Sequence, residues 1–268
     1  MKLGIVIPLK SREVSRDWET TTRALQCTLD SIAAQTCRDF AVCIAGHEKP
    51  EFMKHKAYHE FRFVTVDFPP PKAKLPPPQD EATKPLINSH LVQDKNLKIT
   101  HAIRALSDED IDYWYQLDSD DLLRTDFVEI SQRVEGHAGA VIVGGYIMYP
   151  SINRVILTTE MHLWCGSTSI LSDKLMNIPD KIDATSIKQI PWCRTTHMRM
   201  PEFFLGECDG NYVNLTDRII AYTLGSGDNI SDKWRRAFIP RLKARLKPYL
   251  WGRRIPPELR RAFSLRDE

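Results

Sequence analysis

Apolar runs and helical spacing alternate along the first half of the chain. Residues 3–9 and the run FAVCIAG from Phe40 are short apolar stretches, as expected of strands buried on both faces of a parallel sheet. Between them, residues 18–35 place apolar side chains at helical spacing. A strand, a helix and a strand in this order predict a βαβ unit. Helical spacing returns over residues 88–106, and the strand-like IDYWYQL follows.

Two further regions complete the pattern. The segment FRFVTVDF predicts a third strand, and residues 69–85 predict a long loop because seven of the seventeen prolines lie there and proline lacks a backbone N–H. After the acidic cluster, AVIVGGYIMYP and RVILTTEMHLW predict two strands joined at residues 151–153, which makes the sheet mixed. A late helix is expected over residues 211–222.

Length and composition agree with one folded domain. The chain has 268 residues, of which 42% are hydrophobic and 27% charged, as in a globular protein with a sizeable core. We expect an α/β domain over residues 1–230, with a mixed, mainly parallel sheet flanked by helices. Residues 138–149 are too few to span a bilayer, which takes about 20 apolar residues, and residues 3–9 are too few for a signal-peptide core. A cytoplasmic protein is therefore expected. The six cysteines show no CxxC pair, which favours reduced thiols over a zinc site or a disulfide framework.

Positive charge is concentrated late in the sequence. Residues 233–261 contain eleven lysines or arginines and one acid, whereas residues 1–232 carry a net charge of −7. Tryptophan, leucine and other large apolar side chains are interleaved with these bases, which predicts a basic amphipathic tail over residues 231–268. Each base near an anionic lipid surface contributes about 1 kcal/mol, so an anionic membrane surface is the expected partner. No nucleic acid is expected, since the basic groups do not extend over the folded domain. A solvated helix packed on the acidic body is the alternative.

An acidic cluster follows the predicted strand IDYWYQL. Asp118 and Asp120, two residues apart at a strand end, can turn toward one divalent cation, and their hard oxygen ligands suit Mn²⁺ or Mg²⁺. An EF-hand loop would also use Glu129, but leucines stand where that loop needs an oxygen ligand and a glycine. The acids could instead cap the next helix, which is a reasonable role for Asp121 or Asp126. Because unpaired acids repel each other unless a cation lies between them, we favour a metal site.

These segments resemble a known family. In order and spacing, IVIPLKSR, TLDSIAAQTCRDFAVCIA and YWYQLDSDDLLRTDFVE resemble the nucleotide-binding half of GT-A glycosyltransferases, especially the inverting family two. LDSDD resembles the DxD motif of that family, and DSDDLLRTDFV also resembles a smaller group described as rhamnosyltransferases. The resemblance implies a GT-A fold with a nucleotide-sugar-binding half over residues 1–129 and an acceptor-binding half over residues 130–230. It is looser after residue 129, through CGSTSILS, GECDG and LGSGDNISDKW.

The resemblance assigns roles around the donor. It implies that Asp120 holds Mn²⁺ or Mg²⁺ on the diphosphate of a nucleoside-diphosphate sugar, that Asp118 contacts the ribose or the metal, and that Asp121 supports them. Residues expected to line the nucleotide pocket are Pro8, Leu9 and Lys10 after the first strand, together with Ser119. His47 stands where family members commonly place an acidic pair that holds the base. Lys95 and Lys98 lie one helical turn apart, where they either reach the diphosphate or are solvated.

The catalytic base is expected late in the chain. Inverting transfer requires a carboxylate that takes the proton of the acceptor hydroxyl. The motif GECDG offers Glu207 and Asp209 in the region where the family places its base, and either acid could instead be the N-terminal charge of the helix expected over residues 211–222. His197 is expected either near the acceptor or the metal, or as a structural side chain.

Further side chains have two readings each. Asp228, Asn229 and Ser231 stand in the region where some relatives carry a late metal-binding histidine, and they could close over the phosphates. Trp164 and Trp192 are candidate surfaces for sugar stacking, or they belong to the core.

The leading functional hypothesis is a metal-dependent inverting glycosyltransferase. It would move a sugar from a nucleoside diphosphate to a glycan or lipid-linked acceptor in surface polysaccharide synthesis, on the inner face of the cell membrane. A sugar-nucleotide nucleotidyltransferase is the first alternative, but PLKSREVS lacks the glycine-rich loop that cradles phosphates. The second is a non-catalytic carbohydrate-binding or membrane-binding module on the same fold.

Overall fold

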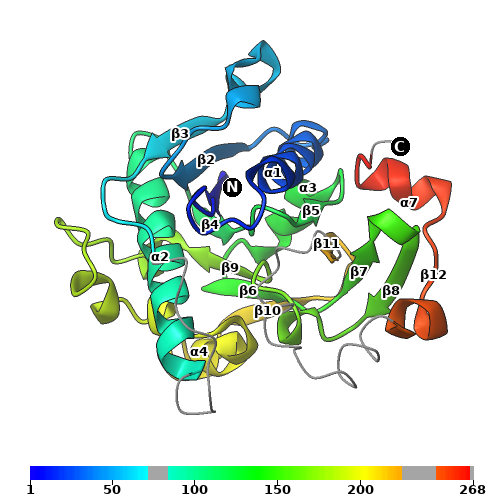
Figure 1. Ribbon diagram of the computed structural model, residues 1–268. Helices are drawn as coiled ribbons and strands as arrows, with labels where there is room; N and C mark the ends of the chain where they lie inside the picture. Colours follow the sequence, from blue (N-terminus) through cyan, green and yellow to red (C-terminus); the bar gives the residue numbers. More distant parts are fainter. Residues whose placement is uncertain (72–83, 225–245, 266–268) are drawn as a thin grey trace.

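Two β-sheets form the framework of the protein. The computed structural model describes residues 1–71, 84–224 and 246–265 (Figure 1). Within these residues the first sheet has seven strands. Their order across the sheet is β10 (Tyr212–Leu215), β6 (Gly139–Ile142), β9 (Ser169–Ser172), β4 (Tyr113–Gln116), β1 (Leu3–Pro8), β2 (Phe40–Gly46) and β3 (Arg62–Thr65). All neighbouring pairs are parallel except the two that involve β9, which runs antiparallel to both β4 and β6.

A smaller sheet lies beside the first. The order of its five described strands is β12 (Arg253–Arg254), β8 (Arg154–Thr158), β7 (Gly145–Tyr149), β11 (Ile220–Thr223) and β5 (Leu122–Leu123). Strands β7 and β8 form the hairpin that the sequence predicts, and its turn ends at Asn153 with a left-handed backbone (φ 51°) that asparagine tolerates.

Helices cover both faces of the first sheet, because alternate residues of each strand point to opposite sides. The helices on this sheet are α1 (Trp18–Ala33), α2 (Lys84–Ala105), α3 (Phe127–Ser131) and α4 (Met200–Glu207), whereas α7 (Pro257–Ala262) lies against the smaller sheet. Ile5 and Ile7 of β1 pack with α1 and α3 in one core cluster, whereas Val6 packs with α2 and α4 in the other. Figure 1 shows α1 and α2 on opposite sides of the central strands. The predicted fold class, a mixed and mainly parallel sheet flanked by helices, is confirmed.

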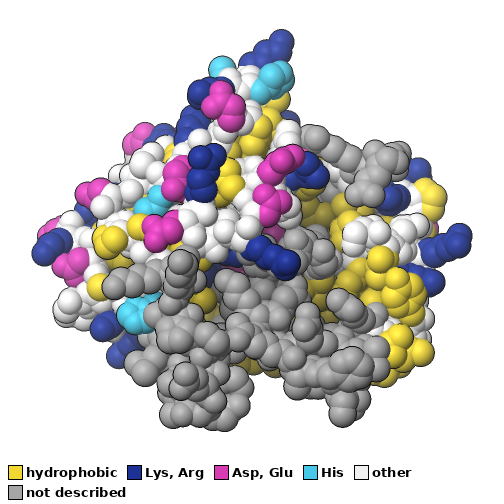
Figure 2. Space-filling view, viewed as in Figure 1, with side chains coloured by type: hydrophobic (Ala, Val, Ile, Leu, Met, Phe, Trp, Pro, Cys, Tyr) yellow, Lys and Arg dark blue, Asp and Glu magenta, His cyan; other side chains and the backbone are white. Residues whose placement is uncertain are grey.

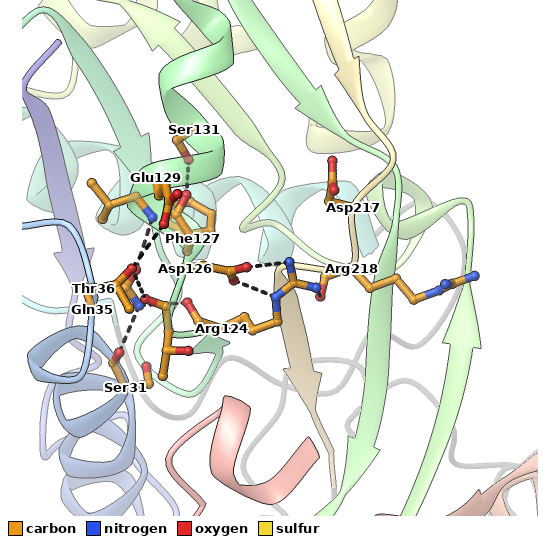
Figure 3. A network of polar contacts seen from close by, with 12 residues as sticks. Ser31, Gln35, Thr36, Arg124, Asp126, Phe127, Glu129, Ser131, Asp217 and Arg218 are labelled. Atoms are coloured by element: carbon orange, nitrogen blue, oxygen red, sulfur yellow. Dashed lines mark hydrogen bonds and ion pairs between the residues drawn. The ribbon is translucent and has the colours of Figure 1, made fainter. Parts of the chain in front are cut away.

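A polar network ties the segment after β5 to the end of α1 (Figure 3). The buried Gln35 amide donates to the backbone carbonyl of Arg124 at 2.8 Å and accepts from Val128 N at 3.0 Å. Ser31 Oγ accepts from Leu123 N at 3.2 Å. The Arg124 guanidinium pairs with the Asp126 carboxylate at 2.6 Å. The chain that leaves the acidic cluster is therefore fixed on both sides.

Two predicted elements differ from the structure. The run AVIVGGYIMYP divides at Gly144 between β6 of the first sheet and β7 of the second, and a Cβ at this glycine would meet the backbone oxygen of Thr216 at 2.1 Å. The helix expected over residues 211–222 is wrong, because β10 and β11 occupy this segment. The apolar positions of residues 211–222 have helical spacing, but a turn between β10 and β11 divides this segment into two strands.

The last described residues pack on the second sheet. Strand β12 pairs antiparallel with β8, and Leu259 and Phe263 of the α7 region are buried against Met148 and Val155. Residues 225–245, which hold much of the predicted basic tail, lie outside the described residues. None of the helices in the described part of the chain combines the length and the hydropathy needed to cross a bilayer.

Candidate active site

Three loops meet at the carboxyl edge of the parallel strands. Lys10 follows β1, His47 follows β2, and the acidic turn, residues 118–121, follows β4. The register places Pro8 beside Ala45 and Val6 beside Gln116, so these strand ends lie next to each other. This edge is where open α/β sheets bind ligands.

Asp121 anchors the acidic turn in the protein interior. Its carboxylate accepts hydrogen bonds from Ser167 Oγ (2.6 Å), Cys165 Sγ (3.0 Å) and Thr223 N (3.3 Å), and its own N–H donates to the backbone oxygen of Asp118 at 3.1 Å. Burial raises the pKa of this carboxyl well above its usual range, and the charges of the two neighbouring acids add to the effect. Because its side chain is only 1% exposed, Asp121 supports the turn and does not meet a ligand.

Asp118 makes an ion pair with Lys95 of α2. Lys95 Nζ lies 2.5 Å from Asp118 Oδ1, and the Asp118 N–H donates to Ser167 Oγ at 2.8 Å. Burial alone would lower the pKa of Lys95, but the charge and the hydrogen bond of Asp118 outweigh it and hold the pKa above its usual value. Gly166 makes room for the pair, because a Cβ there would lie 2.7 Å from Asp118 Oδ2 and 2.8 Å from Lys95 Nζ. About a third of each side chain of the pair is exposed, so a ligand can reach it.

Asp120 is the second acid open to the edge. Thr223 Oγ1 donates to its backbone carbonyl and holds the turn against β11. Burial, followed by the charge of Asp118, raises the pKa of the Asp120 carboxyl to about 6, and Lys10 and Lys95 act in the opposite direction. A carboxylate whose pKa is raised by burial and by a second carboxylate attracts a cation.

A divalent metal fits this pair only in part. Carboxylate oxygens of Asp118 and Asp120 are the hard ligands that Mg²⁺ or Mn²⁺ prefers. In the described ranges, no cluster of three or more His, Cys, Asp or Glu residues is arranged to hold a metal. The protein thus offers two acidic side chains, and the other ligands of such a metal would come from phosphate oxygens and water.

Buried polar atoms without partners lie in the loops after β1 and β2 and on α2. Among the described residues, Ser11 Oγ, His47 Nδ1 and Asp94 Oδ1 are buried and make no hydrogen bond. Ser11 and His47 follow β1 and β2, and Asp94 lies next to Lys95 on α2. Buried polar atoms are normally satisfied, so these three are positions where a bound polar ligand would add hydrogen bonds.

The other predicted donor residues have mixed placements. Lys98 is buried and pairs with Asp94 at 2.7 Å, and burial lowers its pKa despite that carboxylate. Neither Lys95 nor Lys98 is therefore a solvated helix lysine. Leu9 belongs to the core and does not line an open pocket. His47 Nε2 contacts the carbonyl oxygen of Phe68 at 2.9 Å. Pro8 ends β1 in a fully buried strand, and Ser119 is half-buried within the acidic turn.

The structure does not bring Glu207 and Asp209 to the acidic turn. Glu207 ends α4 and Asp209 lies in the turn before β10, and both line a pocket with Asp112, which precedes β4. Because β10 and β4 run in the same direction, these acids lie at the amino edge of the sheet. Asp112 and Asp118 are six positions apart at the two ends of β4, which corresponds to about 20 Å at about 3.3 Å per residue. Proton transfer between this pocket and the acidic turn would need a closer approach.

The remaining candidates divide between site and core. His197 lies within electrostatic range of Lys95 and Asp118, and its Nδ1 is 2.6 Å from the backbone oxygen of His162. Trp164 is 43% exposed next to Cys165, and Lys247 Nζ lies 4.0 Å above its ring. Trp192 is core, and its N–H donates to a backbone carbonyl at 3.1 Å. Residues 228, 229 and 231 lie outside the described residues.

Sequence reasoning missed the loop that supports the acids. Cys165, Gly166 and Ser167 precede the antiparallel strand β9, so they arrive at the same edge as the residues that follow β4. The only signal was the loose family resemblance of CGSTSILS. Thr223, at the end of β11, carried no signal, because a helix was expected up to residue 222 and no strand was expected to end there.

No protein-family model matches the sequence, and no curated protein matches it. Solved structures do match the chain. Staphylococcus aureus TarS, residues 1–349 in complex with UDP, has a TM-score of 0.49 and 11% identity, covering 85% of this chain and 62% of that chain. A protein from Desulfovibrio desulfuricans G20, described as a nucleotide-diphospho-sugar transferase, has a TM-score of 0.42 and 11% identity, covering 92% and 96%. A glycosyltransferase involved in glycosylation of the major capsid of PBCV-1 has a TM-score of 0.38 and 11% identity, covering 83% and 92%. The chain spans about three fifths of the length of the TarS structure, and its chemistry has to be derived from its own site.

Proposed function

We propose that the protein is a glycosyltransferase that uses a nucleoside-diphosphate sugar. The observation that carries the proposal is the acidic turn at the carboxyl edge of the sheet, where Asp118 pairs with Lys95 and Asp120 lies open beside Lys10. A diphosphate is negatively charged and needs cations to bind it. The two lysines beside the acidic turn supply positive charge, and a metal held by the carboxylates would supply more. When bound, Mn²⁺ or Mg²⁺ would offset the negative charge that develops on the departing nucleoside diphosphate.

The protein's own residues would bind and orient the donor. Lys95 and Lys10 would contact phosphate oxygens as point charges, and Ser11 and His47, whose buried polar atoms lack partners among the described residues, would bond to the nucleoside or the diphosphate. Asp121 would keep the turn in place through Ser167. A preorganised site of this kind needs little rearrangement during the reaction.

Transfer to an acceptor hydroxyl distinguishes this function from its alternatives. We propose direct displacement at the anomeric carbon, which inverts its configuration. A nucleotidyltransferase would need a glycine-rich phosphate loop after β1, whereas Lys10, Ser11 and Arg12 stand there. A pure binding module gives no reason to hold two acids and a lysine together at a sheet edge.

The acceptor is proposed to be a glycan or a lipid-linked saccharide at a membrane surface. Residues 246–251 are helical and expose Leu250 and Trp251 beside Arg253 and Arg254, and the right side of Figure 2 shows apolar and basic side chains gathered there. Lys247 of the same segment stacks on Trp164, close to Cys165 of the site. An anionic bilayer that held this surface would keep the site near an acceptor in the membrane, on the cytoplasmic side.

The decisive experiment is donor cleavage. Purified protein is mixed with a panel of nucleoside-diphosphate sugars and Mn²⁺ or Mg²⁺, and release of nucleoside diphosphate is compared between the wild type, Asp120→Asn and Asp112→Asn. We expect one donor class to be cleaved, with a loss of at least 100-fold in Asp120→Asn and little change in Asp112→Asn, whose acid lies at the other end of β4. Absence of cleavage across the panel, together with no metal-dependent nucleotide binding in calorimetry, would show that the protein is not this enzyme.

A further inference from the structure

His197 is held in a single neutral tautomer. It opens the short turn His197–Arg199, and its Nδ1 lies 2.6 Å from the backbone carbonyl oxygen of His162. A carbonyl oxygen only accepts hydrogen bonds, so Nδ1 must carry the hydrogen. In the neutral ring the lone pair is then on Nε2, and this atom can accept a proton.

The ring lies within electrostatic range of the donor site. Burial lowers the pKa of His197, and the charges that act on it belong to Lys95, Asp118 and His162. Lys95 and His162 lower the pKa, whereas Asp118 and the bond to the His162 carbonyl raise it. A half-buried imidazole with a lowered pKa is neutral at neutral pH, which is the form that accepts a proton.

Nε2 is available for a ligand. Within the described part of the chain it makes no hydrogen bond, and it is not one of the buried polar atoms without a partner. Two acids of the turn are occupied, Asp118 by Lys95 and Asp121 by its three donors, and Asp120 is the acid proposed to hold the metal. The described residues also form no metal-holding cluster that would include this imidazole.

We propose that His197 Nε2 is the general base of the reaction, an inference that rests on the proposed glycosyl transfer. The acceptor hydroxyl gives its proton to Nε2 while its oxygen forms a bond to the anomeric carbon of the donor. The bond from that carbon to the diphosphate oxygen breaks, and its electron pair leaves with the nucleoside diphosphate. The imidazolium that forms is stabilised by the His162 carbonyl and by the negative charge of Asp118, and it later loses the proton to solvent.

The test separates a base from a structural histidine. His197→Asn keeps an N–H that can donate to the His162 carbonyl, but it has no basic nitrogen. The reaction followed is cleavage of the active donor with water as acceptor. We expect kcat to fall by about 100-fold to 10,000-fold, with KM for the donor changed by less than about twofold. With the metal at a saturating concentration, which keeps Asp120 ionised, kcat of the wild type should fall as the pH drops through a pKa below 6.5, and this acidic limb should vanish in the variant.

His59→Asn is the matched control. His59 Nε2 also contacts a backbone carbonyl, that of Lys54 at 3.1 Å, but in an exposed loop after β2. It should keep the wild-type rate and pH profile. If His197→Asn does not fold, as judged by circular dichroism, His197→Gln takes its place in the same assay.

Two failures remain distinguishable. A wild-type protein that cleaves no donor overturns the proposed function, and the base with it. A cleaving wild type whose His197→Asn variant keeps kcat within about threefold, or keeps the acidic limb, overturns only the role of His197. If the variant still binds the released nucleoside diphosphate in calorimetry, the loss of rate in the variant lies in the chemical step.

Discussion

Lys95 Nζ and Asp118 Oδ1 lie 2.5 Å apart and join helix α2 to the turn that follows β4. Twenty-three residues separate them in the sequence. The pair gives the acidic turn a cation of its own, so the carboxylate of Asp118 is ordered before any ligand binds. A ligand that reaches this pair meets a lysine that can turn to a phosphate and an acid that can turn to a metal.

Gly166→Ala should damage this pair without unfolding the protein. The added Cβ would lie under 3.0 Å from Asp118 Oδ2 and Lys95 Nζ, which are the ends of flexible side chains and can move. We expect nucleotide-sugar affinity in calorimetry to fall at least tenfold, because both groups must leave their places. Gly206→Ala is the control, since no described atom lies within 4 Å of its Cβ. Equal affinity in the two variants would mean that the pair does not take part in binding.

Gln35→Ala should lower the free energy of unfolding by about 2–3 kcal/mol. The Gln35 amide makes buried hydrogen bonds to Arg124 O and Val128 N, and truncation leaves both groups without this partner. Urea unfolding followed by fluorescence measures the change. Gln26→Ala is the comparison, because this glutamine is half-buried and its amide bonds to Tyr58 Oη at 3.0 Å, and it should cost less than about 1 kcal/mol. A similar cost for both would contradict the importance of the network in Figure 3.

Cys43 and Cys193 should resist alkylation in the native protein. Burial raises the pKa of each thiol to about 12. A raised pKa keeps the thiol protonated at pH 8, and only the thiolate reacts. Mass spectrometry after a short iodoacetamide treatment should find both unmodified, while the half-exposed Cys37 is labelled. After denaturation in guanidinium, all six cysteines should react. Native labelling of Cys43 at the rate of Cys37 would argue against the buried β2 strand.

Replacing Leu250 and Trp251 with serine should weaken binding to anionic vesicles. The two side chains are 70% and 71% exposed, and each would contribute about 1.5 kcal/mol or more when buried in the lipid interface. We expect about a tenfold loss of partitioning per residue in sedimentation with phosphatidylserine vesicles. Leu205→Ser is the control, because Leu205 is 61% exposed on α4 without the arginines beside it. Wild-type protein that stays in the supernatant would remove the membrane from the proposal.

Much of the fold could be predicted where the local pattern is long or strong. Helix α1 and strands β1, β2 and β4 follow from apolar spacing and from continuous buried runs. Strand β9 could not be predicted, because its four residues SILS are too short to show a period. The apolar positions from 212 to 222 match a helix, although two four-residue strands occupy this segment. Short strands depend on their sheet neighbours more than on their own sequence.

The sequence predicted the site only for residues that directly follow a predicted strand, because the strand direction then fixes the edge of the sheet. Asp118 and Asp120 were placed at the carboxyl edge because they follow a strand. Glu207 and Asp209 precede one, and a residue before a parallel strand lies at the opposite edge. The tautomer of His197 depends on a backbone carbonyl 35 residues away, which no pattern in the sequence reveals.

The pairing of β8 with β12 also governs when the protein can fold. Arg154 lies opposite Arg254, so the outer edge of β8 stays open until the ribosome has added another hundred residues. Until then the apolar surface around Met148 and Val155 has no cover from Leu259 and Phe263. A nascent chain in this state exposes an unpaired strand edge together with an apolar surface. Chaperones recognise this combination, and it promotes aggregation. A premature stop codon before Arg253 should therefore yield insoluble protein, although every residue of the candidate active site would already have been made.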